Sequence, residues 1–273
     1  MTALASQRQA VILEEIERLG AVRVSRLVDT LGVSDMTVRR DLDVLARRGL
    51  LTKVHGGAIS SAERSIDEPG FEAKQVRAQS EKDAIAHAAA ELIRPGTAIG
   101  ISAGTTTWTM AHLVRDIPGL TVVTNSMRVA DVVLSSGRSD QTVVLTGGIR
   151  TPSDALVGPV AVEALKSLHL DLVFLGVHGV DERSGFTTPN LMESETNRAL
   201  VEAGRRLVVV ADHTKWGMVG LSTIVPLDAA DVLITDDEMP EPVLALLREH
   251  VEDVVVACTP RDSRQPARVV DGP

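Results

Sequence analysis

Residues 33–58 read VSDMTVRRDLDVLARRGLLTKVHGGA, and this stretch decides the fold of the N-terminal part of the chain. Ser34 is a residue type that caps a helix N-terminus by accepting a backbone N–H, and Gly49 can end the helix in the left-handed conformation. Between them, apolar side chains recur at i, i+4 and i+7 and therefore share one face: Val38, Leu42 and Leu45. The stretch predicts an amphipathic helix that is followed by a short basic strand.

The preceding residues predict the other helices of a winged helix-turn-helix. A first helix with an apolar stripe begins near Ser6 and stops at Gly20. Residues 21–24 read as a short strand, and Ser25 is expected to cap a second, brief helix. Gly32 stands where a tight turn between two helices needs a residue without a Cβ atom.

Residues 51–54 are expected to return as the strand of the wing. In such modules the second helix of the pair enters the major groove of DNA with its N-terminal residues, while neighbouring basic groups hold phosphates. The residues predicted to contact DNA lie on this helix and in the wing: Ser34, Met36, Thr37, Arg39, Arg40, Arg47, Lys53 and His55.

The charge distribution favours double-stranded DNA over the alternative of a helical packing module with a solvated basic face. Residues 1–58 carry nine Lys or Arg against seven Asp or Glu, although the whole chain has a net charge of −9. An acidic chain repels DNA unless one segment reverses the sign locally. Single-stranded nucleic acid is a poor alternative because its binders stack bases on aromatic rings, and the first aromatic residue of this chain is Phe71.

The 273 residues leave room for a small module and one larger domain. We expect a DNA-binding domain over residues 1–58, a linker over 59–77, an effector-sensing domain over 78–260 and a disordered tail over 261–273. No apolar run reaches the ~20 residues that span a bilayer, and the N-terminus lacks the apolar core of a signal peptide, so the protein is expected in the cytoplasm.

Cys258 is the only cysteine. A single cysteine excludes an internal disulfide and a multi-cysteine zinc site, and it suits a reducing compartment. Because it ends the apolar run VVVAC, it is expected to be a small core residue.

Beyond the linker, seven apolar runs alternate with amphipathic segments. Strands that are apolar along their whole length and separated by helical crossovers indicate a parallel sheet covered on both faces. The predicted strands are residues 98–102, 120–124, 142–146, 170–175, 207–211, 232–235 and 254–257.

The loop SAGTTTWTMA, residues 102–111, is the strongest candidate for a ligand site, because ligands bind outside the carboxyl ends of the strands in such sheets. Gly104 lets the backbone approach a ligand closely, and Thr105, Thr106 and Thr107 offer hydroxyls beside the N–H groups that open the next helix. This is anion-binding chemistry. The loop is neither a Walker P-loop nor a dinucleotide fingerprint, and the alternative is an ordinary tight turn with threonine capping.

Four further polar loops follow predicted strands, at residues 124–126, 146–148, 176–181 and 211–215. They should reach the same edge of the sheet and form a sugar-sized pocket. Lys215 would neutralise a phosphate. The other predicted effector contacts are Asn125, Ser126, Gly147, Gly148 and Asp181.

Some polar residues of these loops have an equally good structural explanation. Asp181 and Asp212 can each cap a helix or pair locally instead of contacting a ligand. His178 and His213 lack the compact His and carboxylate cluster of a metal site, so structural roles are predicted for both. We therefore expect no metal and no cofactor.

The chain resembles the DeoR family of bacterial transcriptional regulators up to about residue 258. The resemblance is carried by the stretch at 33–58 and by SAGTTT, VVTNS, LTGG, GFTT and ADHTKWG in the second half. It implies a winged-helix DNA reader joined to a Rossmann-like α/β sensor domain similar to ribose-5-phosphate isomerase and glucosamine-6-phosphate deaminase. Such sensors usually bind a phosphorylated sugar, and members are most often repressors and oligomers. One departure is Ser102, where the family often carries Asp.

Two alternatives stand beside a repressor of carbohydrate-metabolism genes that responds to a phosphorylated sugar. The first is a sugar-phosphate isomerase or deaminase with a DNA-binding appendage, which needs a carboxylate base and an assisting group; the residue types available are Asp181, Glu193, Glu195 and Lys215. The isomerase-type catalytic motif is not intact, so no catalytic residue is assigned. The second alternative, a constitutive DNA-binding structural protein, leaves the polar loops unexplained.

Overall fold

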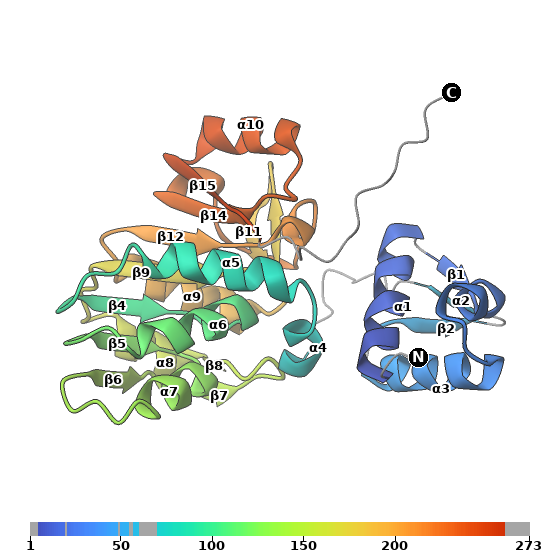
Figure 1. Cartoon of the computed structure of the whole chain (residues 1–273). Coiled ribbons are helices and arrows are strands. Elements are labelled where there is room, and N and C mark those ends of the chain that lie inside the picture. Colours follow the sequence, from blue (N-terminus) through green and yellow to red (C-terminus); the bar gives the residue numbers. More distant parts are fainter. Residues whose placement is uncertain (1–4, 20, 49, 55–56, 60–69, 260–273) are drawn as a thin grey trace. The chain divides into compact units, whose positions relative to one another are not determined.

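A computed structural model describes residues 5–19, 21–48, 50–54, 57–59 and 70–259 (Figure 1). The chain divides into two compact units, Met1–Ala73 and Lys74–Pro273. The segment expected to be the linker, residues 59–77, contains regular structure near both ends, because Ile59 belongs to strand β3 and Phe71–Gln75 form helix α4. The expected disordered tail lies outside the described residues.

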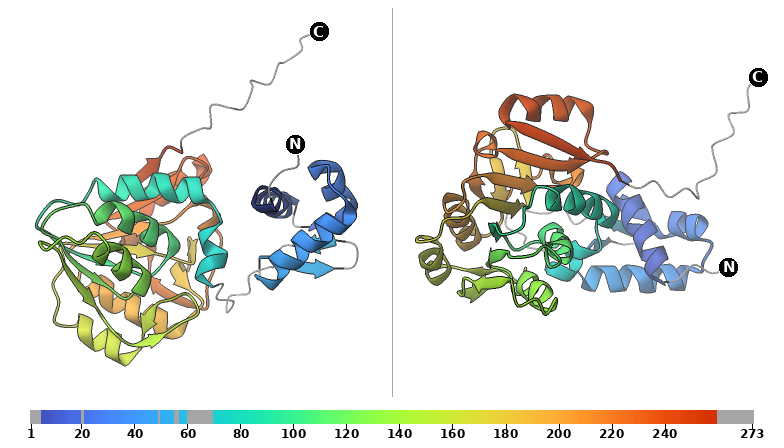
Figure 2. Two further views of the ribbon diagram at one scale, coloured as in Figure 1. Left: turned by 60° about the horizontal axis from the view of Figure 1, so that its bottom comes forward. Right: turned by 60° about the vertical axis from the view of Figure 1, so that its left-hand side comes forward.

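Among the described residues up to Ile59, the N-terminal unit contains three helices and a three-stranded antiparallel sheet of order β1-β3-β2. Figure 2 shows the three helices gathered beside the small sheet. This arrangement confirms the predicted winged helix-turn-helix. The elements are α1 (Ala5–Leu19), β1 (Ala21–Arg23), α2 (Val24–Leu31), α3 (Asp35–Arg47), β2 (Thr52–Val54) and β3 (Gly57–Ile59).

The ends of these helices test the predicted caps. Ser34 accepts a hydrogen bond from the Thr37 N–H and caps α3, and Gly32 adopts φ 62° in the turn between α2 and α3, both as expected. The prediction for Ser25 is wrong. Strand β1 runs directly into α2, so the residue before the helix is Arg23, in extended conformation, and Ser25 falls within the first turn. Gly49 lies outside the described residues.

The face of α3 that the periodicity predicts to be apolar is the one that packs into the core. Val38, Leu42 and Leu45 are at most 1% exposed. Asp41 is also buried on this helix, where Arg8 of α1 donates to its carboxylate at 2.9 Å. This bond satisfies the buried charge and ties α3 to α1.

The C-terminal unit is built on a seven-stranded parallel sheet of order β15-β14-β12-β9-β4-β5-β6. All seven predicted strands are confirmed, with ends that differ by one or two residues. The strands are β4 (Ala98–Ile101), β5 (Thr121–Thr124), β6 (Thr142–Leu145), β9 (Leu172–Gly176), β12 (Leu207–Val210), β14 (Val232–Asp236) and β15 (Asp253–Ala257).

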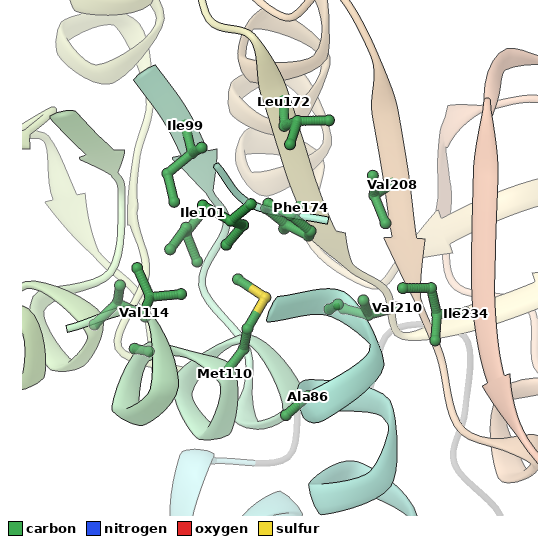
Figure 3. Packing of buried hydrophobic residues seen from close by; sticks show 14 of the residues in the cluster. Ala86, Ile99, Ile101, Met110, Val114, Leu172, Phe174, Val208, Val210 and Ile234 are labelled. Carbon is green, nitrogen blue, oxygen red and sulfur yellow. The ribbon is translucent and has the colours of Figure 1, made fainter. Parts of the chain in front are cut away.

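Both faces of this sheet are buried, as the continuously apolar strands predict. On β9, Leu172 and Phe174 join the core on one face, while Val173 and Leu175 join the core on the other. Figure 3 shows the first core, where Met110 and Ala86 approach the strands from the covering helices.

Three helices cover each face of the sheet. The first group is α5 (Gln79–Ala90), α6 (Thr105–Val114) and α7 (Met127–Leu134). The second group is α8 (Pro159–Leu165), α9 (Leu191–Glu202) and α10 (Glu241–His250). The left view of Figure 2 shows α5 and α8 on opposite sides of the sheet.

Several short elements, most of them at the carboxyl ends of the strands, are not among those predicted from the sequence. The elements at the carboxyl ends are the antiparallel strands β10 (Gly179–Asp181), β11 (Gly185–Thr188) and β13 (Ser222–Val225), the hairpin β7 (Ile149–Arg150) with β8 (Leu156–Val157), and the 3-10 helix η1 (His213–Lys215). A second 3-10 helix, η2 (Leu227–Ala229), precedes β14 and therefore lies at the amino end of that strand.

Two further expectations concern single features of the chain. Cys258 is exposed, because it follows Ala257 at the end of β15, so its assignment to the core is wrong. No helix in the described ranges combines the length and the apolar character that a bilayer crossing requires.

Candidate functional site

The first candidate site is the outer surface of α3. Met36 is 77% exposed, Arg40 is exposed, and Thr37 is half-buried with its hydroxyl 2.9 Å from that of Ser34. The structure therefore brings the N-terminal residues of this helix together on its solvent face. Of the predicted DNA contacts, His55 lies outside the described residues.

The basic residues of this surface differ in their partners. The Arg39 guanidinium donates to the Asp35 carboxylate one turn earlier, which raises the pKa of Arg39, and the Lys53 ammonium pairs with Asp43. Arg40 and Arg47 are exposed and make no ion pair or side-chain hydrogen bond within the described parts of the chain. Among the predicted DNA contacts that the structure describes, these two basic side chains are therefore the ones without an ion-pair partner.

The second candidate site is a pocket at the carboxyl ends of strands β4 and β9, which we call the strand-end pocket. It collects side chains and backbone from α4, the β4–α6 loop, the β9–β10 connection, the end of β11, α9 and η1. Its lining residues are Lys74, Ala103, Gly104, Thr105, Thr106, Gly176, Val177, His178, Thr188, Glu193, Asn197 and Lys215.

The β4–α6 loop is held in place by bonds to its neighbours. The Ser102 hydroxyl accepts from the Gly176 N–H at 2.9 Å, the Ala103 N–H donates to Asn125 Oδ1 at 2.9 Å, and the Thr107 hydroxyl donates to the Ser102 carbonyl at 2.8 Å. Ser102 is fully buried. Ser102, the residue that departs from the family pattern, thus links the end of β4 to the end of β9. It does not line the pocket.

The start of α6 offers N–H groups to the pocket. Gly104 precedes this helix, and no side chain caps it. The first N–H groups of a helix have no partner within the helix and carry the positive end of its dipole, so they attract anions. Thr105 and Thr106 stand at this position and line the pocket.

Charged and polar groups complete the lining. Lys215 comes from η1 and Lys74 from α4, so two ammonium groups share the pocket with the Glu193 carboxylate, which accepts from the Thr188 hydroxyl at 3.1 Å. Asn197 is 1% exposed, and its Oδ1 is a buried oxygen without a hydrogen-bond partner. A buried acceptor without a partner is costly unless a ligand supplies the donor.

Four of the ten predicted effector contacts line this pocket: Gly104, Thr105, Thr106 and Lys215. The structure gives the others a different role. Thr107 is fully buried and bonds backbone, and Asn125 uses both ends of its amide on backbone, accepting from Ala103 and donating to the Leu156 carbonyl at 3.3 Å. Ser126 caps α7 by accepting from the Val129 N–H.

The remaining predicted contacts also serve the fold. Gly147 and Gly148 adopt φ of 73° and 123°. A Cβ atom on Gly148 would lie 2.5 Å from the Val157 carbonyl, so this glycine admits a neighbouring strand where we expected a ligand. Asp181 accepts from the backbone N–H groups of Arg183 and Ser184 in the turn after β10, and these bonds lower the pKa of Asp181.

Several residues of the lining, among them His178, Lys74 and Asn197, were not predicted as effector contacts from the sequence. His178 was assigned a structural role, and Lys74 lies in the segment that was taken as linker. Asn197 follows Glu193 by four residues and so shares its face of α9, which is a signal that periodicity could have given.

The other polar loop residues behave as caps or pairs. Asp212 accepts from the Thr214 N–H and caps η1, and His213 donates to the buried Asp236 carboxylate at 2.8 Å. Within the described residues no group of three His, Cys, Asp or Glu side chains is placed to hold a metal ion. Of the residue types considered for catalysis, Glu193 and Lys215 line the pocket, whereas Asp181 and Glu195 do not.

Family models match both units. Residues 8–64 match a DeoR-like helix-turn-helix domain, and residues 77–237 match a DeoR C-terminal sensor domain. The helix-turn-helix match extends past the boundary at residue 58 that the sequence analysis proposed.

Curated relatives are similar along nearly their whole length. An uncharacterized HTH-type transcriptional regulator of Escherichia coli strain K12, YgbI, is 37% identical over 86% of this chain and 91% of its own. A putative aga operon transcriptional repressor of Escherichia coli O157:H7 is 33% identical over 92% and 93%. The glycerol-3-phosphate regulon repressor of Escherichia coli strain K12 is 30% identical over 90% and 96%.

The similarity to solved structures is more distant. A D-ribose-5-phosphate isomerase in complex with phospho-erythronic acid is 15% identical, with a TM-score of 0.37 over 50% of this chain and 52% of that one.

Proposed function

The chain belongs to the DeoR family of transcriptional regulators, and from this premise we propose that it represses carbohydrate-metabolism genes under the control of a phosphorylated sugar. Relatives that are named as repressors of the aga operon and of the glycerol-3-phosphate regulon support the assignment to carbohydrate metabolism. A cytoplasmic location goes with this proposal, because a regulator must reach its operator.

The observation that carries the proposal is the composition of the strand-end pocket. An uncapped helix N-terminus at Gly104–Thr106 and the Lys215 ammonium suit a phosphate. The unpartnered Oδ1 of Asn197 and the carboxylate of Glu193 suit hydroxyl donors. A ligand that carries a phosphate and several hydroxyls matches both sets of groups at once.

The outer surface of α3 supports operator binding by the N-terminal unit. Met36, Thr37 and Arg40 stand near the start of the helix, which is the part that reaches base edges in this motif. Arg47 and Lys53 are proposed to hold phosphates. One winged helix reads few base pairs, so we propose that the protein acts as a dimer or larger assembly on repeated half-sites.

The alternative of a sugar-phosphate isomerase or deaminase is not favoured. The relatives that match along nearly their whole length are named as regulators. Glu193 and Lys215 do share the pocket, so turnover is measured together with binding in the experiment below.

The experiment is a thermal-shift screen of the full chain with phosphorylated sugars, their unphosphorylated parents and inorganic phosphate. A ligand that binds only the native state raises the unfolding temperature. We expect at least one sugar phosphate to stabilise the protein more than its parent sugar does, and to change its affinity for a DNA duplex selected from random sequence. Absence of any stabilisation, or conversion of the sugar phosphate to product, would overturn the proposal.

Asn197→Ala tests the role of the unpartnered acceptor. We expect this variant to lose affinity for the sugar phosphate about 10-fold or more and to keep its affinity for inorganic phosphate, because a site built to bond a hydroxyl discriminates by that bond. Lys166→Gln, which removes an exposed lysine paired with Glu163, is the matched control for unspecific effects. Equal losses for both ligands would show that Asn197 acts on the fold of the pocket.

A further inference from the structure

Lys82 is a buried lysine that the proposed function does not use. It lies in the first turns of α5 and is 3% exposed. Its ammonium donates to the Lys74 carbonyl at 2.6 Å and to the Arg77 carbonyl. Lysine is almost never fully buried unless its charge is compensated, so this placement calls for an explanation.

The two bonds fasten one short segment of the chain to α5. Lys74 belongs to the last turn of α4, where helix carbonyls have no partner within the helix, and Arg77 follows that helix. An ammonium group with three donors can serve both carbonyls. The segment from Lys74 to Arg77 is therefore held by Lys82 at its backbone, which leaves the side chain of Lys74 able to line the strand-end pocket.

The charge of Lys82 lies within electrostatic reach of the pocket. Burial lowers the pKa of Lys82 to about 8. The Asp212 carboxylate raises this pKa, Lys215 and Arg77 lower it, and Glu81 raises it. Lys215 lines the pocket, and Asp212 caps η1, the 3-10 helix that contains Lys215. Charges beside the pocket therefore act on the ammonium group that holds the segment from Lys74 to Arg77.

The fastened segment stands at the boundary between the two units. Ala73 closes the first unit and Lys74 opens the second, so this segment is the covalent start of the sensor on the side that leads to the DNA-binding unit. Ala78, the residue between this segment and α5, adopts φ 46°, a left-handed conformation that costs energy for alanine.

We propose that Lys74 is a further effector-binding residue and that Lys82 is the positioning residue that holds it. Through this contact, the order of residues 74–78 depends on whether a ligand occupies the strand-end pocket. This inference rests on the proposed function, because it concerns the same anion site. An anion between Lys74 and Lys215 adds an attraction that exists only when the segment is in place, and a ligand shifts a conformational equilibrium by its difference in affinity for the two states.

The test uses the full-length protein with inorganic phosphate as the probe. Phosphate affinity is measured by calorimetry, and the order of residues 74–78 is measured by hydrogen exchange with and without saturating phosphate. In the unsubstituted protein, phosphate should slow exchange in this segment about 5-fold or more. A protein that binds neither phosphate nor any sugar phosphate of the screen would overturn the proposed function itself, and this inference with it. A protein that binds a sugar phosphate but no inorganic phosphate would overturn this inference alone.

Two variants separate the inference from the proposed function. Lys74→Gln should weaken phosphate binding about 10-fold, whereas the control Lys166→Gln should not. Lys82→Met keeps the apolar stem and removes the ammonium; it should still bind phosphate through Lys215 and α6, but phosphate should no longer slow exchange in residues 74–78.

A purely structural Lys82 would lower the unfolding temperature of Lys82→Met and leave the phosphate-dependent protection intact, and that result would overturn the inference while the proposed function stands. Should Lys82→Met fail to fold, Lys74→Gln decides the matter. Unchanged phosphate affinity and unchanged protection in that variant would equally overturn the inference.

Discussion

Helix α3 presents the side chains that we propose to contact DNA from a single run of residues, whereas the strand-end pocket collects its lining from segments as far apart as Lys74 and Lys215. On α3 the residues that matter are exposed, and Arg40 makes no internal ion pair within the described chain. Around the pocket the charged residues Lys74, Glu193 and Lys215 are half-buried. Many of the uncharged polar residues there are buried, and some of them bond backbone, as Asn125 does.

The two regions differ in how well the sequence alone predicts the role of a polar residue. On a solvent-facing helix, periodicity alone separates the buried face from the face that can meet a partner. At the carboxyl ends of buried strands, a Thr, Asn or Asp has two competing uses, because backbone N–H and C=O groups there also need partners. Only the pocket lining in three dimensions tells the two uses apart.

The largest expected effect is on the pocket side of the comparison, at Thr106. Thr106→Glu places a carboxylate beside the proposed phosphate position, and like charges in a buried site repel strongly, so phosphate affinity should fall at least ~100-fold. Thr106→Gln has the same shape without the charge and is the matched control. DNA binding without effector should be unchanged, and a phosphate response equal to that of the unsubstituted protein would place the anion site elsewhere.

On the other side of the comparison, the two neighbouring arginines of α3 should behave differently. Arg40→Ala should weaken binding to a selected DNA duplex by about 1–3 kcal/mol, because its guanidinium is available for a base or phosphate contact. Arg39→Ala should cost less, since Arg39 is already paired with Asp35. Both variants should unfold at nearly the temperature of the unsubstituted protein. Equal losses of DNA affinity would show that the Asp35 pair opens on the duplex.

Asn125→Ala sharpens the comparison by testing a residue that the sequence assigns to the ligand and the structure assigns to the scaffold. Removing this amide leaves the buried Ala103 N–H and Leu156 carbonyl without their partner, so the free energy of unfolding should fall by about 1–3 kcal/mol. Denaturant titration measures the change. A variant of unchanged stability that no longer binds phosphate would restore Asn125 as a ligand residue.

The smallest effect concerns His213, which shares η1 with Lys215. Its hydrogen bond to the buried Asp236 carboxylate raises the pKa of His213. The pKa of His213 is higher in the folded protein than in the unfolded chain. The contribution of this hydrogen bond to the free energy of unfolding is therefore complete below about pH 6.5 and is lost as pH rises through the folded pKa. Unfolding temperatures across this range should fall more for the unsubstituted protein than for His213→Asn. Parallel curves for the two proteins would contradict the assignment.

The spacing of apolar residues and the positions of turn and capping residues in the sequence determined the architecture. Val38, Leu42 and Leu45 marked the buried face of α3, and seven apolar runs marked the seven parallel strands, because these patterns follow from the repeat of a single helix or strand. The errors are local. Ser25 was taken as a cap where β1 leads directly into α2, and Cys258 was taken as core although β15 ends at Ala257.

The tertiary structure alone decided the composition of the pocket. The sequence identified Gly104, Thr105, Thr106 and Lys215, because they follow strands at the edge where ligands bind. It could not distinguish them from Asn125 or Gly148, which follow strands equally well but satisfy backbone or admit a neighbouring strand. Nor could it supply Lys74 or Asn197, which come from helices outside those loops. The reason is physical: a hydrogen-bond partner or a close backbone approach depends on atoms far away in the chain, and no local repeat encodes them.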